Sequence, residues 1–379
     1  MADIVPLCRP SISEAEIAAV TEALRSGWMA HGDFNHKFEH AFCKYLDVKQ
    51  AVSMNSCTSA LEAALAVAGV RGEVIIPSMT WVATANAVVA TGGTPVFAEV
   101  DPLTRNLTAD LIAARLTPRT EAVIVVHFGG QPCPMDAIVE LCQRKSLLLI
   151  EDSAETLGAT WRGKQAGSFA IGCFSFFPTK NITTGEGGML TCNDAEFARK
   201  VRAICAHGVS STTLEREKQK RPWLRAAEMV GHNYRLSNVL AAIGYHQMQR
   251  LDEMNARRME LARRYDAAIA GLGNVIEAPR ITPGATHVYQ MYTVTVPAAA
   301  RDNIVNGMKA DGIGASVHFD PPVHLQPYYQ THWHGCEGML PATELLSRRL
   351  ITLPMYPDMA IDQQDLVIAS LQRMIAAHC

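Results

Sequence analysis

Short apolar runs alternate with helical patterns through the first half of the chain. The segments between the runs, such as WVATANAVVATG and PMDAIVELCQRK, carry their apolar residues at helical spacing. The apolar runs read EVIIP, TPVFAEVD, EAVIVVHFGG and SLLLIEDSA, at 73–77, 94–101, 121–130 and 146–154. Apolar strands spaced by helices are typical of a buried parallel sheet with right-handed crossovers. The pattern therefore predicts an α/β protein with a mainly parallel central sheet.

Two more helices are expected before the first of these runs. SISEAEIAAVTEALRSG contains Ser13 and Glu16 in a capping-box pattern, and it ends on Gly27. NSCTSALEAALAVAG, at 55–69, places small hydroxyl residues where its helix would begin.

The second half of the chain has a different pattern. Residues 238–271 predict one or two long helices, which are long enough to link two domains. The segments after them predict a strand, a helix, and a helix that runs into a strand or turn, at 287–296, 301–315 and 345–358. We therefore expect a large domain with an N-terminal arm at 1–250 and a small α+β C-terminal domain at 251–379.

Composition narrows the class of protein. The 379 residues carry a formal charge of −3, so no basic footprint indicates nucleic acid. The ten cysteines include no C-x-x-C pair, and His332 and His334 lack a third ligand in register, so no metal site is expected. The N-terminus has no secretory pattern and no apolar run approaches membrane-spanning length, so we expect a cytoplasmic protein without a membrane partner.

Two polar features would fall at the carboxyl edge of the predicted sheet, where ligands bind in such folds. Asp152 ends an apolar strand, so it is either a cap of the next turn or the partner of a cationic group. Glu151 beside it would face the opposite way, because strand side chains alternate. The helix start in 55–69 could bind a phosphate through its free N–H groups, although a simple N-cap explains the same residues.

Lys180 lies in CFSFFPTKNITTGEGGML, where aromatic residues precede one lysine and glycines follow it. Most loop lysines are solvated, but an apolar wall would desolvate the amine and make it a nucleophile towards carbonyls. We expect no acid beside Lys180, since a carboxylate would keep the amine protonated. With Asp152 and the helix start, Lys180 would hold a phosphorylated pyridine aldehyde, pyridoxal 5'-phosphate (PLP). Trp81 could stack on the ring or be an ordinary core residue.

The sequence strongly resembles the DegT–StrS family of sugar aminotransferases, which have the aspartate-aminotransferase fold (fold type I). The resemblance runs nearly end to end, and the order and spacing of its motifs make it specific. The motifs are NSCTSALEAAL, PSMTWVATANAV, VVHFGGQPCPMDAI, IEDSAETLGA, FSFFPTKNITTGEGGM, GHNYRLSNVLAAIGYHQ and SRRLITLPMYPDM. The resemblance implies that the large domain binds PLP.

The resemblance also implies roles around the cofactor ring. Lys180 matches the lysine that forms a Schiff base with PLP and later shuttles protons, and Asp152 matches the acid at the pyridine nitrogen. Trp81 matches the aromatic residue that stacks on the ring. Glu155 stands near the ring oxygen, where many members have Gln or His.

Further positions match those that bind the cofactor phosphate. Cys57 and Thr58 match the residues that bind it through the backbone and a hydroxyl, although Gly is usual at position 57. Ser175 matches a phosphate-binding serine on the strand before the lysine. Asn233 matches an asparagine that reaches the phosphate of the neighbouring subunit, which implies a homodimer with shared active sites.

By resemblance, the amino donor is L-glutamate, which leaves as 2-oxoglutarate, and the acceptor is a nucleotide-linked 4-keto-6-deoxy hexose. A keto-cyclitol or a 3-keto sugar is the alternative acceptor, and a PLP-binding regulatory protein without turnover is the alternative of another class. The dehydratase branch has histidine at the lysine position, so Lys180 disfavours it.

Two segments could contact the substrate. His318, His324 and Tyr328 lie in a loop that resembles one near the active site of 4-keto-sugar aminotransferases, although the ordinary explanation of such loop residues is that they face solvent. The charged segment 210–223 could meet a diphosphate or form a solvated face.

Overall fold

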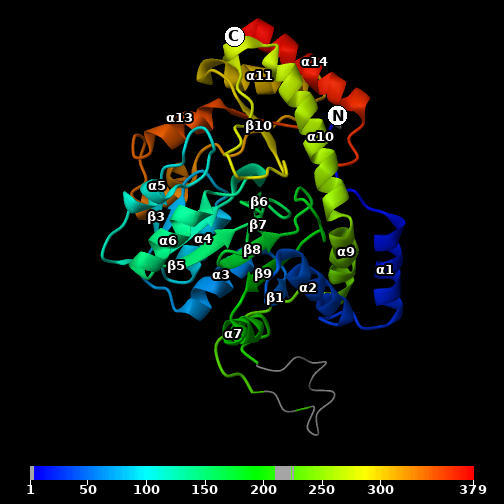
Figure 1. Ribbon diagram of the computed structural model, residues 1–379, viewed down its shortest axis with the longest axis vertical. Helices are drawn as coiled ribbons and strands as arrows, with labels where there is room; N and C mark the ends of the chain where they lie inside the picture. The colour runs from blue at the N-terminus through cyan, green and yellow to red at the C-terminus, as the bar shows by residue number, and fades with distance from the viewer. Residues whose placement is uncertain (1–3, 210–222, 224–225) are drawn as a thin grey trace.

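The computed structural model describes residues 4–209, 223 and 226–379 (Figure 1). A seven-stranded sheet with the order β1-β9-β8-β5-β4-β2-β3 forms its centre. The pairs among β3, β2, β4, β5 and β8 are parallel, whereas β9 runs antiparallel to both β8 and β1. The strands are β1 Gln50–Met54, β2 Glu73–Pro77, β3 Thr94–Ala98, β4 Thr120–Val126, β5 Leu148–Asp152, β8 Ile171–Ser175 and β9 Gly188–Cys192. This arrangement confirms the predicted α/β class with its mainly parallel sheet.

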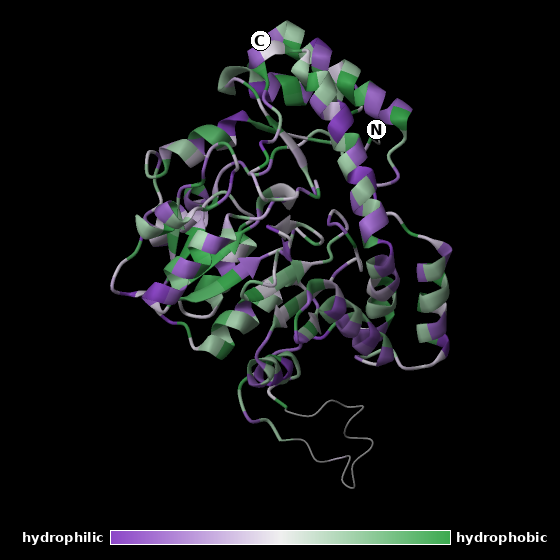
Figure 2. Cartoon of the chain, viewed as in Figure 1, coloured by the Kyte–Doolittle hydropathy of each residue, from purple (hydrophilic) through white to green (hydrophobic). Residues whose placement is uncertain are grey.

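Helices cover both faces of the sheet, because the strand residues that point to each face are apolar. Ile124 and Ile150 pack on one face against α3, α4 and α7, whereas Val123 and Leu149 pack on the other against α5 and α6. The strands accordingly carry mostly hydrophobic residues along their length, green in Figure 2. The helices are α3 Cys57–Ala68, α4 Ala83–Ala90, α5 Ala109–Ala113, α6 Met135–Lys145 and α7 Ala195–Cys205.

The N-terminal helices pack beside the β1–β9 end of the sheet. Ser13 caps α1 (Glu14–Arg25), and its exchange of hydrogen bonds with Glu16 is the predicted capping box. Phenylalanines of α2 (Asp33–Leu46) pack against Phe174 and Phe176 in a core shared with α9 (Asn238–Gln249). The aromatic run before Lys180 is therefore largely core, although Phe177 is exposed.

The C-terminal part has a separate hydrophobic core. Helix α10 (Leu251–Ala270) continues from α9 after a break at Arg250 and runs to the upper part of the molecule in Figure 1. Val5 joins this core and bridges Ile313, so the N-terminal arm packs on the C-terminal part. The other elements are α11 Ala298–Ala310, α12 Pro327–Trp333, α13 Pro341–Arg349, α14 Ile361–His378, and the antiparallel pair β10 Tyr292–Thr295 and β11 Leu350–Leu353. The domain boundary at 250 stays a prediction that coincides with this break.

Smaller elements complete the described chain. They are a hairpin of β6 (Thr160–Trp161) and β7 (Lys164–Gln165), and the 3₁₀ turns η1 Phe128–Gly130, η2 Gly273–Val275 and η3 Val323–Leu325. None of the helices in the described residues combines the length and apolar character that a membrane crossing needs.

Candidate active site

A cavity of about 480 Å³ opens at the carboxyl edge of the parallel strands. Val126, Asp152 and Ser175, the last residues of β4, β5 and β8, line it side by side. The start of α3 lies at the same edge, because β1 enters the sheet in the direction of β8 and α3 follows it at once. The sheet topology therefore places the predicted residues together at the edge where α/β folds bind ligands.

Asp152 is the buried acid of the cavity, with 6% of its surface exposed. The Thr84 hydroxyl donates to its Oδ2 at 2.9 Å, the Ala154 N–H donates to Oδ1 at 3.2 Å, and the Cys57 thiol lies 3.8 Å from Oδ1. Burial raises the pKa of Asp152 above its ordinary value, while the hydrogen bonds from Thr84 and Ala154 partly oppose that shift. Asp152 is thus a carboxylate held in one orientation and able to face a cationic ring nitrogen.

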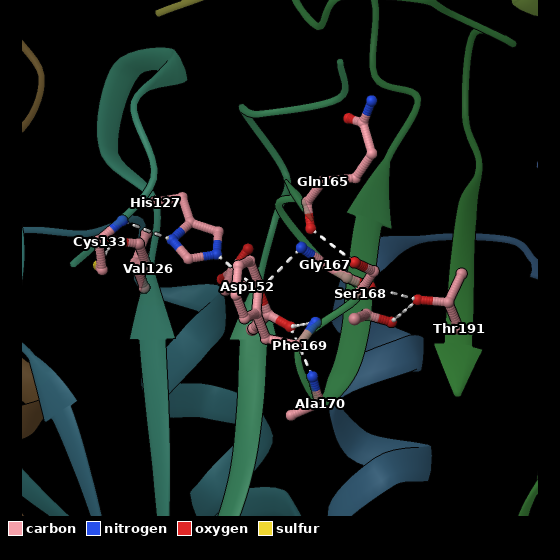
Figure 3. Close-up of polar contacts among 12 residues, drawn as sticks. Val126, His127, Cys133, Asp152, Gln165, Gly167, Ser168, Phe169, Ala170 and Thr191 are labelled. Atoms are coloured by element: carbon pink, nitrogen blue, oxygen red, sulfur yellow. Dashed lines mark hydrogen bonds and ion pairs between the residues drawn. The ribbon is translucent and has the colours of Figure 1, made fainter. Parts of the chain in front are cut away.

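Glu151 points to the opposite side of β5, as expected, and anchors a loop there. Its carboxylate accepts N–H groups of Gly167, Phe169 and Ala170, each at 2.8 Å (Figure 3). His127 Nε2 lies 3.1 Å from the same carboxylate, and His127 Nδ1 accepts the Cys133 N–H. His127 therefore carries a ring proton on Nε2 and donates it to Glu151 in a hydrogen bond. This network fixes the end of β5 next to Asp152.

Lys180 lines the cavity, but an acid lies next to it. Its Nζ is 3.2 Å from Glu155 Oε1, and the side chains of both residues are largely buried. The Gly129 N–H donates to the other Glu155 oxygen at 2.8 Å. The expectation that no acid lies beside Lys180 is therefore wrong, because the turn after β5 brings Glu155 to the amine. Glu155 instead accepts a hydrogen bond from the Lys180 amine.

The start of α3 forms a cradle of backbone N–H groups. Ser56 is the N-cap, and its hydroxyl accepts the Ser59 N–H at 3.1 Å. The first N–H groups of a helix have no intrahelical partner, and Cys57 and Thr58, which carry two of them, line the cavity. A Cβ on Gly188 would lie 2.3 Å from the Ser56 carbonyl carbon, so only glycine lets β9 pass this close. The cradle suits an anion such as a phosphate.

Comparisons with known proteins agree with this geometry. Residues 10–372 match the model of the DegT/DnrJ/EryC1/StrS aminotransferase family. The chain belongs to this family. It is 38% identical to the spore coat polysaccharide biosynthesis protein SpsC of Bacillus subtilis (strain 168), over 98% of this chain and 97% of that protein.

Solved structures of aminotransferases are also similar to this chain over nearly its whole length. The aminotransferase TlmJ of Streptoalloteichus hindustanus is 34% identical, with a TM-score of 0.91 over 99% of both chains. The PLP-form of the putative sugar aminotransferase Spr1654 of Streptococcus pneumoniae is 26% identical, with a TM-score of 0.90 over 99% of both chains. The fold type I prediction is confirmed, and this chain is a PLP-dependent aminotransferase.

The residues of the aminotransferase cavity fit PLP. The α3 cradle suits its phosphate, Asp152 its ring nitrogen and the Lys180 amine its aldehyde. Bound there, PLP supplies an electron sink for a carbanion next to the transferred nitrogen. Ser175 lines the cavity, and its hydroxyl accepts the Phe177 N–H at 3.3 Å.

Aromatic side chains form the rim of the cavity. Trp81 is 63% exposed, so it is not a core tryptophan, and its ring centre lies 6.1 Å from that of Phe319. His318 also lines the cavity and bonds through Nδ1 to the Thr352 hydroxyl at 2.8 Å. Burial lowers the pKa of His318, so its ring is neutral at pH 7.

The other two candidate substrate residues lie elsewhere in the aminotransferase. His324 is fully buried, and its ring nitrogens bond to the Ser78 hydroxyl at 2.7 Å and to Glu344 at 3.1 Å. The prediction of a substrate contact or a solvent-facing position for His324 is therefore wrong, because both nitrogens are engaged inside the protein. Tyr328 is half exposed, stacks on His332, and does not line the cavity.

Asn233 lies outside the cavity on an exposed segment, where Arg235 Nε donates to its Oδ1 at 3.1 Å. Most of the charged segment 210–223 lies outside the described residues. Among the residues that the structure describes, no three His, Cys, Asp or Glu side chains gather where they could hold a metal ion.

Several cavity residues come from distant segments and were not predicted from the sequence. Leu7 and Cys8 belong to the N-terminal arm, and Gln290 and Thr352 belong to the C-terminal part. Gln290 lies in the strand expected over 287–296 and Thr352 lies in the motif SRRLITLPMYPDM, but neither pattern places its residue in the cavity, because only the tertiary fold brings them there. Thr84 could have been predicted, because it stands one helical turn after Trp81 in the motif PSMTWVATANAV.

Proposed function

We propose that the enzyme transfers the amino group of L-glutamate to a keto sugar, and that the sugar is a nucleotide-linked 4-keto-6-deoxy hexose. One observation carries the proposal. Lys180 is the single Lys or Arg among the described residues that line the cavity, and it faces a buried acid and a helix N-terminus. These are the three groups that PLP needs.

In this proposal Lys180 holds the cofactor and then moves a proton between the donor carbon and the cofactor carbon. Glu155 lies 3.2 Å from the Lys180 amine and can hold a proton while the amine is neutral. Asp152 stays ionised and pairs with the ring nitrogen. Trp81 stacks on the ring, and Cys57, Thr58 and Ser175 surround the phosphate.

The aromatic rim supports a sugar as the acceptor. Trp81, Phe177 and Phe319 present flat apolar surfaces at the mouth of the cavity. The C–H faces of a sugar pack on such rings, while its hydroxyls need polar partners like the Thr80 hydroxyl and His318. The relationship to a polysaccharide biosynthesis protein of Bacillus subtilis supports the same class of substrate.

Both substrates are anionic, and this favours a shared site. Lys180 holds the cofactor in this proposal. The carboxylates of glutamate and the diphosphate of the sugar nucleotide therefore need other cations. Asn233 and Arg235 are exposed outside the cavity, where they can reach into a second subunit. Helix α1 leaves Ile17 and Leu24 about half exposed, seven residues apart on one face, which a second copy would cover. We therefore propose a homodimer with shared sites.

All ten cysteines are free thiols, which supports a reducing cytoplasm as the location. This placement belongs to the proposal and is testable by fractionation.

The function is tested by incubating the purified enzyme with PLP, L-glutamate and each member of a panel of keto-sugar nucleotides. Mass spectrometry should detect a sugar nucleotide that has exchanged its keto oxygen for an amine, together with 2-oxoglutarate. The panel includes 3-keto isomers and a keto-cyclitol. A product from the cyclitol alone would overturn the sugar-nucleotide acceptor, and colour that ignores L-glutamate would overturn the donor.

A further inference from the structure

The backbone around Lys180 is held by side chains from three distant segments. The carbonyls of four consecutive residues, 178–181, each accept a hydrogen bond. Cys8 Sγ lies 3.7 Å from the Pro178 carbonyl oxygen, and Gln290 Nε2 donates to the Thr179 carbonyl at 2.8 Å. The other two carbonyls are both held by one residue of α10, Arg258.

Arg258 reaches the lysine loop with both ends of its guanidinium. Its Nη2 donates to the Lys180 carbonyl at 3.3 Å, and its Nη1 donates to the Asn181 carbonyl at 3.4 Å. Only 2% of the residue is exposed, and it forms no ion pair with a carboxylate of the described residues. Burial lowers the pKa of Arg258 to about 10, so the side chain is still cationic at pH 7. The charge of Asp358 acts on Arg258 without forming an ion pair, and a buried cation held in this way is costly, which indicates that its bonds to the loop matter.

Asn255 lies one turn before Arg258 on the same buried face of α10. Asn181 Nδ2 donates to Asn255 Oδ1 at 2.7 Å, and Asn255 Nδ2 donates to the Leu157 carbonyl at 3.0 Å. Leu157 follows Glu155 by two residues. Helix α10 thus joins the loop that carries Lys180 to the loop that carries Glu155, and it continues into the C-terminal core.

We propose that Arg258 is a positioning residue, which sets the backbone of Lys180 so that the amine meets both Glu155 and the cofactor aldehyde. The inference rests on the proposed role of Lys180. Arg258 is not among the residues that line the cavity, and it acts by holding two adjacent carbonyls from a rigid helix. Misplacement of a reacting group by about 1 Å can cost on the order of a hundredfold in rate. Loss of the bonds from Arg258 should therefore slow the reaction.

The test compares Arg258→Met, Arg258→Lys and, as a matched control, Arg264→Met. Arg264 lies on the same helix, but it pairs with Asp365 at the surface. The first readout is the rate at which cofactor-free protein turns yellow when PLP is added, which needs no amino donor. The second readout is the rate of colour loss at saturating L-glutamate. The glutamate concentration that gives half of that rate is measured as well.

We expect Arg258→Met to slow both rates at least about tenfold, with the half-saturating glutamate concentration nearly unchanged. Arg258→Lys should recover part of the loss, because one ammonium can bond one of the two carbonyls. Arg264→Met should match the wild type. A purely structural role would lower the melting temperature without slowing capture by the folded fraction, and that result would overturn the proposal.

If Arg258→Met does not fold, Arg258→Lys decides alone, and a capture rate equal to that of Arg264→Met would overturn the proposal. Lys180→Ala separates this test from the proposed function. A borohydride-stable label on Lys180→Ala would refute the role of Lys180, whatever the Arg258 variants do.

Discussion

Asp152 must stay ionised in the proposed function although its side chain is buried. Its position at the end of an apolar strand raises its pKa, and the hydroxyl of Thr84 is the side-chain bond that most opposes this shift. Residues near the chemistry were recognisable in the sequence because each needs a particular side chain at a particular edge. Their supporting contacts were not, since the bond from Thr84 to Asp152, the approach of Glu155 to Lys180 and the bonds from Arg258 are defined only in the folded chain.

Replacing Thr84 with Val removes the hydroxyl and keeps the shape of the side chain. The pKa of Asp152 should rise further, because its ionised form loses a donor. The glutamate half-reaction needs ionised Asp152, so its acid limb should move to higher pH by about one unit, given that a hydrogen bond to a charged group contributes roughly 1.5–3 kcal/mol.

The measurement is the rate of colour loss with L-glutamate across a range of pH. Thr91→Val, at the other end of α4, removes a hydroxyl that bonds only helix carbonyls, and it should leave the limb in place. An unmoved acid limb in Thr84→Val would contradict the role of Thr84.

At the scale of elements, the sequence predicted best where strands are buried on both sides. The ranges of β2, β3 and β5 lie within the predicted apolar runs and β4 begins one residue before its run, because a continuous apolar run bounded by polar residues has few alternatives. The strand expected over 287–296 forms only at Tyr292–Thr295, since the N–H groups of Val288 and Met291 bond to the Gly129–Gly130 turn instead. The antiparallel strand β9 was not predicted, because its pairing with β1 joins residues that are far apart in the sequence.

The close passage of β9 over the start of α3 gives a prediction for Gly188. A methyl group in Gly188→Ala would meet the backbone of Ser56 and Cys57 and would push the helix start away. Overpacking of this kind destabilises by about 1–3 kcal/mol, and PLP affinity should fall because the phosphate cradle moves.

Titration of cofactor-free protein with PLP measures the affinity, and urea unfolding measures the stability. Gly271→Ala is the control, because its Cβ would meet nothing closer than 3.7 Å in ordinary helical backbone. PLP affinity in Gly188→Ala equal to that of the control would refute the cradle.

For the whole molecule, a buried carboxylate ties several elements together at the β1 edge of the sheet. Glu39 of α2 accepts the Ser53 N–H and hydroxyl of β1, both at 2.8 Å, and pairs with Arg202 of α7 at 2.8 Å. Burial alone would raise its pKa, but His31, whose Nε2 lies 3.7 Å away, and the charge of Arg202 outweigh burial and lower the pKa of Glu39 to about 2.

A folded pKa below the unfolded value means that Glu39 stabilises the fold above about pH 4.5 and loses this effect as the pH falls toward 2. Glu39→Gln should therefore lower the free energy of unfolding by about 3 kcal/mol at pH 7, and the difference should shrink through that acid range. Urea unfolding at several pH values measures it, with exposed Glu196→Gln as the control. A difference that is independent of pH would show that the charge of Glu39 is not the cause.

The central claim is that Lys180 forms the bond to PLP in the cavity at the carboxyl edge of the sheet. Borohydride reduction of the yellow protein, followed by peptide mapping, tests it most directly. The account predicts one labelled peptide per chain, with the pyridoxyl group on Lys180. A label on another lysine, or no label on a yellow protein, would contradict it.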